Sequence, residues 1–352
     1  MQIHIEPFTV HKRVPLTISR GTRAGSTNLW VRIEAEGYEG WGEASPFSIG
    51  EKTQTTEQIA DDLARLVPVL STMHPMERQL IEEAIASEHP GVCSAARAAV
   101  DVALWDWLGK RVGLPLWQLW GLDLSRIGPT AVTVGISSPD GAAQRLQQWC
   151  HQQTVASVKV KLGSPAGIEA DQAMFSALLP DVPTGAKVSV DANGGWSLTD
   201  AVQMAQWLSH RGVSYLEQPL AVREDDLLPQ LREQSPLPIF ADESCFGSAD
   251  IHRLAHCVDG INIKLMKAGG LTEARRMIHT ARACGLQVMF GCYSDSAIAN
   301  TALAQLSPLA DHLDLDSHFN LKDDPFDGAQ LSDGALIPNT RPGLGLSRHA
   351  DT

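Results

Sequence analysis

Short apolar runs recur at regular spacing through the middle of the chain, and each ends in a residue that can do chemistry. The runs cover residues 158–161, 188–191, 215–217, 239–242 and 261–264. Their charged ends lie roughly 22 to 30 residues apart, about the length of one strand, one loop and one helix. The pattern therefore predicts successive βα units of a parallel barrel, in which the carboxyl ends of the strands meet at one face.

Further apolar runs bring the predicted barrel strands to eight. Residues 130–135 precede the five runs, and residues 287–292 and 312–316 follow them. Apolar residues at helical spacing fill the intervals between strands, for example 198–210 and 272–284. Eight alternating units favour a (β/α)8-type barrel over an open sheet, which would be expected to carry glycine-rich nucleotide-binding turns. The sequence contains neither a GxGxxG motif nor a P-loop.

The chain outside these units has a different pattern. Strand-like alternation near the N-terminus is followed by helical spacing, and the end of the chain is rich in glycine and proline. We therefore predict an α/β protein with an α+β domain over residues 1–125, the barrel over 126–320 and a tail over 321–352 that packs back on the first domain. Residues 18–27 are predicted as a flexible basic loop, for which a plain surface hairpin loop is the simpler interpretation, and residues 45–50 as a second irregular segment.

Composition and net charge limit the classes of molecule that the protein can be expected to bind. A formal net charge of −13 over 352 residues disfavours nucleic acid and anionic membrane, since both require a basic surface. Apolar runs stay well below the ~20 residues of a membrane span, and the N-terminal residues lack the pattern of a signal peptide. We expect a cytoplasmic protein. The six cysteines form no CxxC pair, and free thiols in a reducing compartment are the better interpretation.

Three of the predicted strands end in carboxylates. Asp191, Glu217 and Asp242 would meet at one mouth of the barrel, where mutual repulsion is costly unless a cation neutralises it. Hard oxygen ligands favour Mg²⁺, with Mn²⁺ as an alternative. Three unrelated acids that cap helix N-termini are the other interpretation, which the geometry of barrel strand ends disfavours.

Two lysines close the set from opposite sides of the mouth. Lys161 and Lys264 end the second and sixth strands, and we expect burial beside a metal and other cations to lower the pKa of such a lysine toward that of a general base. One lysine would remove the proton α to a carboxylate, Mg²⁺ would stabilise the enediolate, and the other lysine would return a proton to the opposite face. A salt bridge is the simpler role for either lysine alone, but not for the pair beside three carboxylates.

A pair of acids lies on the eighth predicted strand. Asp314 and Asp316 are two residues apart and therefore face the same way. No lysine or arginine adjoins them before Lys322. Paired carboxylates without a protein partner suit the capture of an ammonium group, and a structural role in the loop is an equal alternative.

These motifs resemble the enolase superfamily, in particular its muconate-lactonizing-enzyme subgroup, for which a lysine base with Mg²⁺ is a known pattern. The resemblance implies a modified TIM-type (β/α) barrel with an N-terminal α+β capping domain completed by the C-terminal tail. It runs almost end to end, and the matching pieces are Lys159-Val160-Lys161, Asp191-Ala192-Asn193, Glu217-Gln218-Pro219, Ala241-Asp242-Glu243-Ser244 and Ile263-Lys264-Leu265-Met266-Lys267-Ala268-Gly269-Gly270.

Within the subgroup, Asp314-Leu315-Asp316 is similar to the DxD signature of dipeptide epimerases such as L-Ala-D/L-Glu epimerase. The resemblance implies a Mg-dependent isomerase that inverts the α-carbon of the C-terminal residue of a dipeptide, with Lys161 and Lys264 as the acid/base catalysts. The two acids would hold the ammonium group of the dipeptide, and Lys159 would support substrate binding. The resemblance also allows a homo-oligomer.

The same resemblance assigns supporting roles. Asn193 stands two residues after Asp191 and Glu243 directly follows Asp242 in the matching motifs, and we expect them to hold these ligands in place. The irregular segments 18–27 and 45–50 would be mobile parts of the capping domain that close over substrate.

The preferred substrate side chains are left open by the sequence. Tyr293, Ser294 and Asp295 stand where L-Ala-D/L-Glu epimerases tend to carry methionine, an aliphatic residue and glutamate, and we expect them to contact the substrate. Arg20 and Arg23 could hold an acidic side chain or simply be solvated.

Alternative functions share most of the predicted site. Muconate cycloisomerase, o-succinylbenzoate synthase and N-acylamino acid racemase use the same lysines and metal ligands, and only the DxD pair argues against them, because their substrates carry no free ammonium group. A sugar-acid dehydratase would require a histidine after the sixth or seventh strand, where none stands. A non-enzymatic metal-binding protein would leave Lys161 and Lys264 dispensable.

Overall fold

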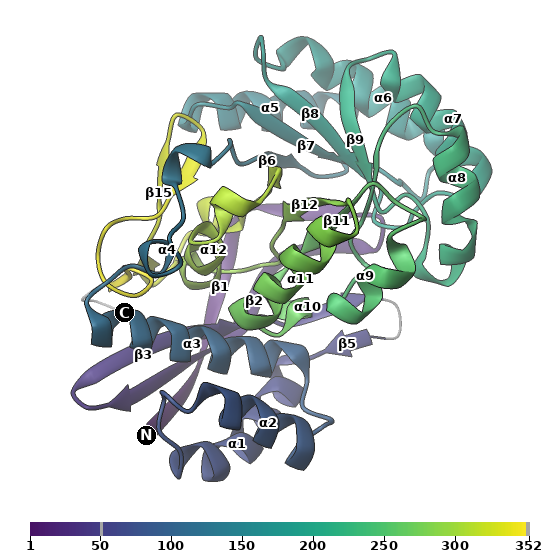
Figure 1. Cartoon of the computed structure of the whole chain (residues 1–352). Helices are drawn as coiled ribbons and strands as arrows, with labels where there is room; N and C mark the ends of the chain where they lie inside the picture. Colours follow the sequence, from purple (N-terminus) through teal and green to yellow (C-terminus); the bar gives the residue numbers. More distant parts are fainter. Residues whose placement is uncertain (50–51, 350–352) are drawn as a thin grey trace.

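An eight-stranded parallel sheet forms the centre of the computed structural model, which describes residues 1–49 and 52–349 (Figure 1). The strands are β6 (Val132–Val134), β7 (Ser157–Lys161), β8 (Lys187–Asp191), β9 (Val213–Glu217), β10 (Ile239–Ala241), β11 (Gly260–Ile263), β12 (Gln287–Phe290) and β13 (His312–Leu313), neighbours in this order. A parallel bridge from Thr130 to Leu313, with the Ala131 N–H donating to the Leu313 carbonyl at 2.8 Å, joins the two edges. The predicted (β/α)8-type barrel is therefore confirmed.

Helices cover the outside of the barrel. They are α5 (Pro139–Gln152), α6 (Ile168–Leu178), α7 (Leu198–Ser209), α8 (Leu228–Gln234), α9 (Ser248–Leu254), α10 (Leu265–Ala268), α11 (Leu271–Ala283) and α12 (Ala297–Ala304). In α5 the Ser138 hydroxyl accepts from the Gly141 N–H, and Pro139 occupies the first turn, so the sequence contains its own start signal. Among the described helices, none is both long enough and apolar enough to cross a bilayer.

The inside of the barrel is divided into two layers. Tyr215, Phe240 and Met289 form a small apolar cluster separate from the main core. On β7, Val158 and Val160 belong to the main core that the barrel shares with its helices, whereas the alternate residues Lys159 and Lys161 pair with carboxylates of other strands. The alternation of side chains along β7 thus places the two lysine ammonium groups inside the barrel, at the carboxyl ends of the strands.

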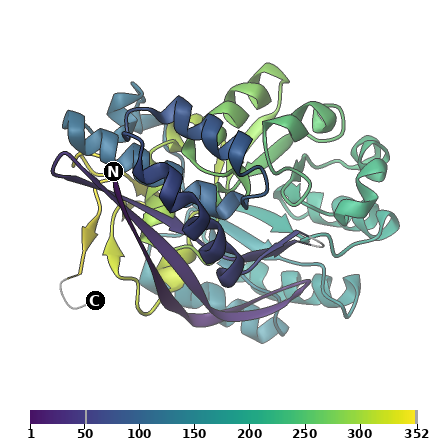
Figure 2. The same cartoon turned by 90° about the horizontal axis from the view of Figure 1, so that it is seen from below.

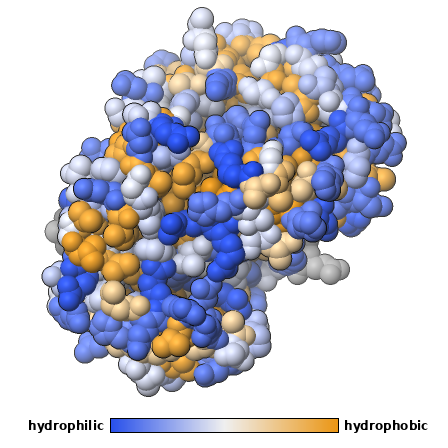
Figure 3. All heavy atoms as spheres, in the orientation of Figure 1, coloured by the Kyte–Doolittle hydropathy of each residue, from blue (hydrophilic) through white to orange (hydrophobic). Residues whose placement is uncertain are grey.

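A capping domain precedes the barrel. Its antiparallel sheet contains β1 (Gln2–Ile18), β2 (Gly21–Ala35) and β3 (Tyr38–Ala44), followed by the hairpin of β4 (Phe47–Ile49) and β5 (Lys52–Gln54). The helices α1 (Thr56–Ser71), α2 (Arg78–Glu88), α3 (Ser94–Val112) and α4 (Leu116–Leu119) come next. Figure 2 shows the two long strands extending from the N-terminus along the barrel. The face in Figure 3 is largely hydrophilic, with separate apolar patches.

The predicted loop over residues 18–27 is wrong for most of its length. Residues 21–27 belong to β2 and pair with β1, so the turn consists of Ser19 and Arg20. The reason is side-chain chemistry that favours strands. The hydroxyl groups of Thr17 and Thr22 form a cross-strand hydrogen bond, with their oxygen atoms 2.8 Å apart, and those of Thr9 and Thr27 form another at 2.9 Å. In the second irregular segment residues 47–49 form β4, and Gly50 lies outside the described residues.

The C-terminal tail returns to the capping domain. It forms the short pairs β14 (Phe326–Asp327) with β17 (Ser347–Arg348) and β15 (Gln330–Ser332) with β16 (Ala335–Ile337). The Phe326 ring lies 5.5 Å from the Trp30 ring and 5.1 Å from the Trp41 ring. Asp106 of α3 accepts from the Leu344 N–H at 2.7 Å and from the Trp41 N–H at 2.9 Å. The tail thus completes the capping domain, although residues 350–352 of the predicted tail lie outside the described residues. The domain boundaries stay a prediction.

Close packing of α3 on β3 depends on two glycines. A Cβ atom at Gly42 would lie 1.9 Å from the Ala99 carbonyl oxygen, and one at Gly40 would lie 2.0 Å from that of Ala103. We predict that Gly42→Ala lowers the free energy of unfolding by about 3 kcal/mol, because backbone must move to admit the methyl group. Gly91→Ala is the matched control, since nothing lies within 4 Å of its Cβ. Equal denaturant midpoints for the two variants would contradict the packing.

Candidate active site

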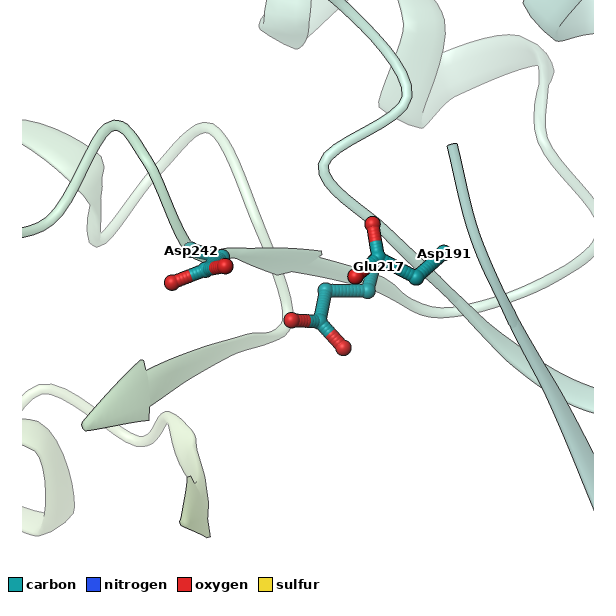
Figure 4. A group of neighbouring side chains, drawn as sticks. All are labelled: Asp191, Glu217 and Asp242. Atoms are coloured by element: carbon teal, nitrogen blue, oxygen red, sulfur yellow. The ribbon is translucent and has the colours of Figure 1, made fainter. Parts of the chain in front are cut away.

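Three carboxylates converge at the mouth of the barrel (Figure 4). Asp191 and Glu217 end β8 and β9, and Asp242 directly follows β10. All three are buried, and one oxygen atom of each lies within 4.8 Å of the others. Three buried carboxylates supply the oxygen ligands that Mg²⁺ prefers, and their proximity allows one cation to contact all three. The donor chemistry therefore fits a small divalent cation, as the sequence predicts.

Each of the three carboxylates also has an ammonium partner. The Lys161 Nζ lies 2.6 Å from Asp191 Oδ2, and the Lys264 Nζ lies 2.7 Å from Asp242 Oδ2. Lys159 pairs with Glu217. Burial, followed by the charge of Asp191, raises the pKa of Glu217 to about 7, and Lys159 offsets only part of this. The repulsion between Glu217 and its carboxylate neighbours thus persists beside the lysines, and a cation bound among them would relieve it.

The two predicted catalytic lysines stand on opposite sides of the barrel. Lys161 ends β7 and Lys264 follows β11, and these strands are four places apart in a closed ring of eight. Their side chains keep 8% and 7% exposure, respectively, and both line the same cavity. The two ammonium groups can therefore reach one ligand from two sides.

The expected lowering of the lysine pKa assumes a bound metal ion, and for the metal-bound site it stays a prediction. Burial lowers the pKa of Lys264, but the charge of Asp242 outweighs it, and the pKa lies well above its usual value. The sequence argument assumed a dominant metal charge and did not include the carboxylates that pair with the lysine.

Lys159 lies beneath the cavity and has no exposed side-chain surface. Its Nζ pairs with Glu217 and lies 2.7 Å from Asp314 Oδ2. Lys159 therefore links a triad carboxylate to the DxD pair, and its expected role in substrate binding stays a prediction.

The DxD pair lies beyond the end of β13 rather than in it, since that strand stops at Leu313. Both acids are buried, and both reach Thr133. The Thr133 N–H donates to Asp316 Oδ2 at 2.7 Å, and its hydroxyl donates to Asp314 Oδ1 at 3.2 Å. Lys159 partners Asp314, so the expectation of two acids without a protein partner is wrong for that residue.

Asp316 differs from its neighbour. Among the described residues, no lysine or arginine forms an ion pair with it. Burial, followed by the charge of Asp314, raises the pKa of Asp316 to about 6. Burial acts on Asp314 too, but Lys159 and Lys161 outweigh it and lower the pKa of that group. Asp316 is therefore the member of the pair without an ion-pair partner among the described residues, although the charges of Lys12 and Arg145 act on it from farther away.

Arg20 joins the tip of the β1–β2 hairpin to the mouth of the barrel. Its Nη2 lies 2.8 Å from Glu243 Oε1, and its Nη1 donates to the Asn193 carbonyl at 2.9 Å. The Asn193 Nδ2 donates in turn to Asp191 and to Glu243, each at 3.1 Å. Arg20 thus has protein partners, whereas Arg23 is exposed. Asn193 and Glu243 stand beside the triad, as the sequence predicts.

A cavity of about 460 Å³ lies between the hairpin and the barrel mouth. Its lining includes Lys161, Lys264, Arg20, Arg23, Ser294 and the apolar residues Leu16, Ile18, Pro46, Phe47 and Tyr293. A smaller cavity of about 130 Å³ adjoins it and reaches Asp314 and Asp316. Asp295 lines neither cavity and accepts from the Tyr293 N–H at 3.0 Å, so it supports its own loop. Most of the predicted residues thus surround one connected space.

Two family models match this chain. "Mandelate racemase / muconate lactonizing enzyme, N-terminal domain" matches residues 2–121, and "Enolase C-terminal domain-like" matches residues 141–352. The chain belongs to the mandelate racemase/muconate lactonizing enzyme family. The resemblance stated from the motifs is therefore confirmed.

Several proteins similar to this chain carry names that state an enzyme activity. Two proteins named "Hydrophobic dipeptide epimerase", from Flavobacteria bacterium (strain MS024-2A) and Roseobacter litoralis, are each 43% identical over 98% of the chain, and cover 97% and 98% of their own lengths. A crystal structure of a dipeptide epimerase from Enterococcus faecalis V583, complexed with Mg and the dipeptide L-Leu-L-Tyr, is 31% identical, with a TM-score of 0.91 over 98% of this chain and 99% of that one. These relatives confirm the predicted enzyme class, an epimerase and hence an isomerase.

Several residues of the family member's site were not predicted. The Asn262 Nδ2 donates to Glu217 Oε1 at 2.7 Å, and the Lys267 Nζ lies 2.5 Å from Asp242 Oδ1. Both belong to or adjoin a motif that the sequence offered. The short helix α10 after β11 directs Lys267 back to Asp242, and spacing alone does not show such a reversal. Thr133 and Lys12 belong to none of the motifs in the sequence, so no pattern marks them as site residues.

Glu43 of β3 connects the capping domain to the barrel. It accepts from the Ser296 N–H at 2.9 Å, the Ser296 hydroxyl at 2.7 Å and the Ala299 N–H at 3.2 Å, and so caps the N-terminus of α12. Burial, followed by the charge of Asp295, raises the pKa of Glu43 from 4.5 to about 8.

This shift predicts a pH-dependent stability. Between pH 4.5 and about 8 the folded state holds a proton on Glu43 that the unfolded state releases, so stability falls as pH rises through this range. We expect the unfolding temperature of the natural protein to fall further between pH 5.5 and 8.5 than that of Glu43→Gln, which mimics the protonated acid. An equal fall in both proteins would contradict the assignment to Glu43.

Proposed function

We propose that the protein is a Mg²⁺-dependent epimerase of hydrophobic dipeptides that inverts the α-carbon of the C-terminal residue by two-base proton transfer. The observation that supports this most is the pair of lysines on opposite sides of one cavity, Lys161 and Lys264, with a metal-type carboxylate cluster between them. Inversion requires a proton to leave one face of a carbon and another to arrive at the opposite face. Two ammonium or amine groups that face each other across the substrate meet this requirement.

Asp191, Glu217 and Asp242 would hold the cation, which is Mg²⁺ in the solved relative with L-Leu-L-Tyr, with Mn²⁺ as an alternative. When bound, it would supply positive charge against the negative charge that develops as the α-proton leaves. Asn193 would keep Asp191 in place, and Asn262 would do the same for Glu217. Burial of all three carboxylates strengthens this electrostatic effect.

Lys161 and Lys264 would exchange roles with the direction of the reaction. The neutral amine of one takes the α-proton, and the ammonium group of the other donates a proton to the opposite face. The net change is the configuration of the α-carbon, so the protonation states of the two lysines are reversed at the end of each turnover. Lys159 stays in place beneath them and holds Glu217 and Asp314.

Asp316 would bind the ammonium group of the dipeptide. It is buried, it lines the smaller cavity beside Lys161, and it lacks a cationic partner among the described residues. A bound ammonium group would supply that partner. This distinguishes a dipeptide from the N-acylated or carbocyclic substrates of the alternative enzymes.

A hydrophobic side chain fits the larger cavity. Leu16, Ile18, Pro46, Phe47 and Tyr293 give it an apolar lining. Arg20, which could have bound an acidic side chain, is already paired with Glu243. The names of the two relatives at 43% identity agree with this choice over an Ala-Glu substrate.

We predict that Lys161→Ala and Lys264→Ala each lower epimerisation of hydrophobic dipeptides by at least about 10³-fold, because each removes one of two bases. The rate would be followed by chiral chromatography, and circular dichroism would verify folding. Lys187→Ala, at the opposite end of β8 and exposed, is the control. Retained turnover in a folded Lys161→Ala or Lys264→Ala variant would exclude the two-base mechanism.

Removal of divalent cations with EDTA should stop turnover, and added Mg²⁺ should restore it. Mg²⁺ should also raise the unfolding temperature, since a ligand that binds only the folded state stabilises it. In Asp242→Asn we expect this thermal shift to disappear. Full activity in metal-free protein, or an unchanged thermal shift in the variant, would refute the cation site.

Asp316→Asn tests the ammonium site. We expect kcat/KM for a dipeptide to fall about 100-fold, because a buried charge-assisted contact is lost. Exchange of the α-proton of the matching N-acetylated dipeptide should change little. An equal loss with both compounds would remove Asp316 from substrate recognition.

A further inference from the structure

The loop after β12 places an aromatic ring against only one of the two lysines. The Lys264 Nζ lies 4.6 Å from the centroid of the Tyr293 ring, within the range of a cation–π contact. Among the described residues, no aromatic ring makes such a contact with Lys161, whose ammonium group pairs with Asp191. The surroundings of the two bases are therefore different.

The Tyr293 ring is held from the capping domain. It stacks on the ring of Phe47 with centroids 4.8 Å apart and planes within 1° of parallel. Phe47 lies on β4, is only 2% exposed, and also packs against Phe246 after β10. The position of Tyr293 thus depends on how the capping domain sits on the barrel.

The hydroxyl group does not hold the ring. The Tyr293 oxygen is buried and has no hydrogen-bond partner among the described residues. Burial also raises the pKa of Tyr293 well above its usual value, so the phenol stays neutral and brings no negative charge to Lys264. What Tyr293 offers Lys264 is the face of its ring.

The ion pair of Lys264 with Asp242 is not exclusive to Lys264. Asp242 pairs with Lys264 at 2.7 Å and with Lys267 at 2.5 Å, and it belongs to the carboxylate triad. A cation in the triad would compete for Asp242 but not for the aromatic ring. The Tyr293 ring is therefore the neighbour that can keep Lys264 in place throughout the reaction.

We propose that Tyr293 is a positioning residue for Lys264 alone, and that its stack on Phe47 makes one of the two proton transfers depend on closure of the capping domain. This inference rests on the proposed two-base function. It predicts that loss of the ring impairs proton exchange on the Lys264 face of the α-carbon more than on the Lys161 face.

The test uses variants that keep one base each. In D₂O, Lys161→Ala should exchange the α-proton of one dipeptide epimer through Lys264, and Lys264→Ala should exchange that of the other epimer through Lys161. Tyr293→Leu is then added to each variant. We expect about a tenfold loss of exchange in the Lys161→Ala background and at most about a twofold loss in the Lys264→Ala background. The ratio of the two losses is the readout, measured by mass spectrometry.

Two matched variants sharpen the test. Tyr293→Phe keeps the ring and should leave the ratio close to its starting value, whereas Phe47→Leu should shift it in the direction of Tyr293→Leu. Phe8→Leu removes a comparable stack in the capping domain, with Trp30 at 5.1 Å, and should not shift it. Equal losses on both faces with Tyr293→Leu, or an equal effect of Tyr293→Phe, would overturn the proposal.

Slow exchange in the single-base variants would not prevent a decision. With both lysines present, Tyr293→Leu should raise the primary isotope effect for one α-deuterated epimer and lower it for the other, because one proton transfer becomes limiting. Parallel changes would overturn the positioning role. Failure of the proposed function looks different, since the natural protein itself would then incorporate no deuterium into either epimer.

Discussion

Charge compensation at the carboxyl ends of the barrel strands is the constraint on which the rest of the structure depends. Asp191, Glu217 and Asp242 are buried within 4.8 Å of one another, an arrangement that is costly unless each is paired. Lysines from the second and sixth strands and from the turn after the sixth supply the pairing. The same ammonium groups are the ones that can move protons, so the groups that make the site foldable are also those that give it chemistry.

The capping domain adds what the barrel lacks. Arg20 at the hairpin tip bonds to Glu243 and Asn193 beside the triad, and Glu43 caps the N-terminus of α12. Phe47 stacks on Tyr293, which in turn contacts Lys264. These links cover the cavity with apolar side chains and join the capping domain to Lys264 and the carboxylate triad. Under the proposed function, substrate choice and proton transfer would be coupled through the same few contacts.

Much of this could be predicted from the sequence because strand-end positions in a parallel barrel converge by geometry. The triad, Lys161 and Lys264 follow from spacing alone. What failed depended on side-chain pairings that polarity and spacing do not show, one within a hairpin and one across the barrel. Residues 21–27 became strand through cross-strand threonine pairs, and Lys159 turned out to partner Asp314 across the barrel. The polarity of a segment does not reveal which side chain 155 residues away will pair with it, so Asp314 was wrongly expected to lack a protein partner.

Incubation of the protein with Mg²⁺ and a set of hydrophobic dipeptides in D₂O tests the central claim most directly. Two-base epimerisation predicts that the C-terminal residue of a substrate inverts and that each inverted molecule carries one deuterium at its α-carbon, with no other change in mass. Loss of water, ring formation or inversion without deuterium would contradict it, as would an absence of exchange across the whole set while N-acylated amino acids react.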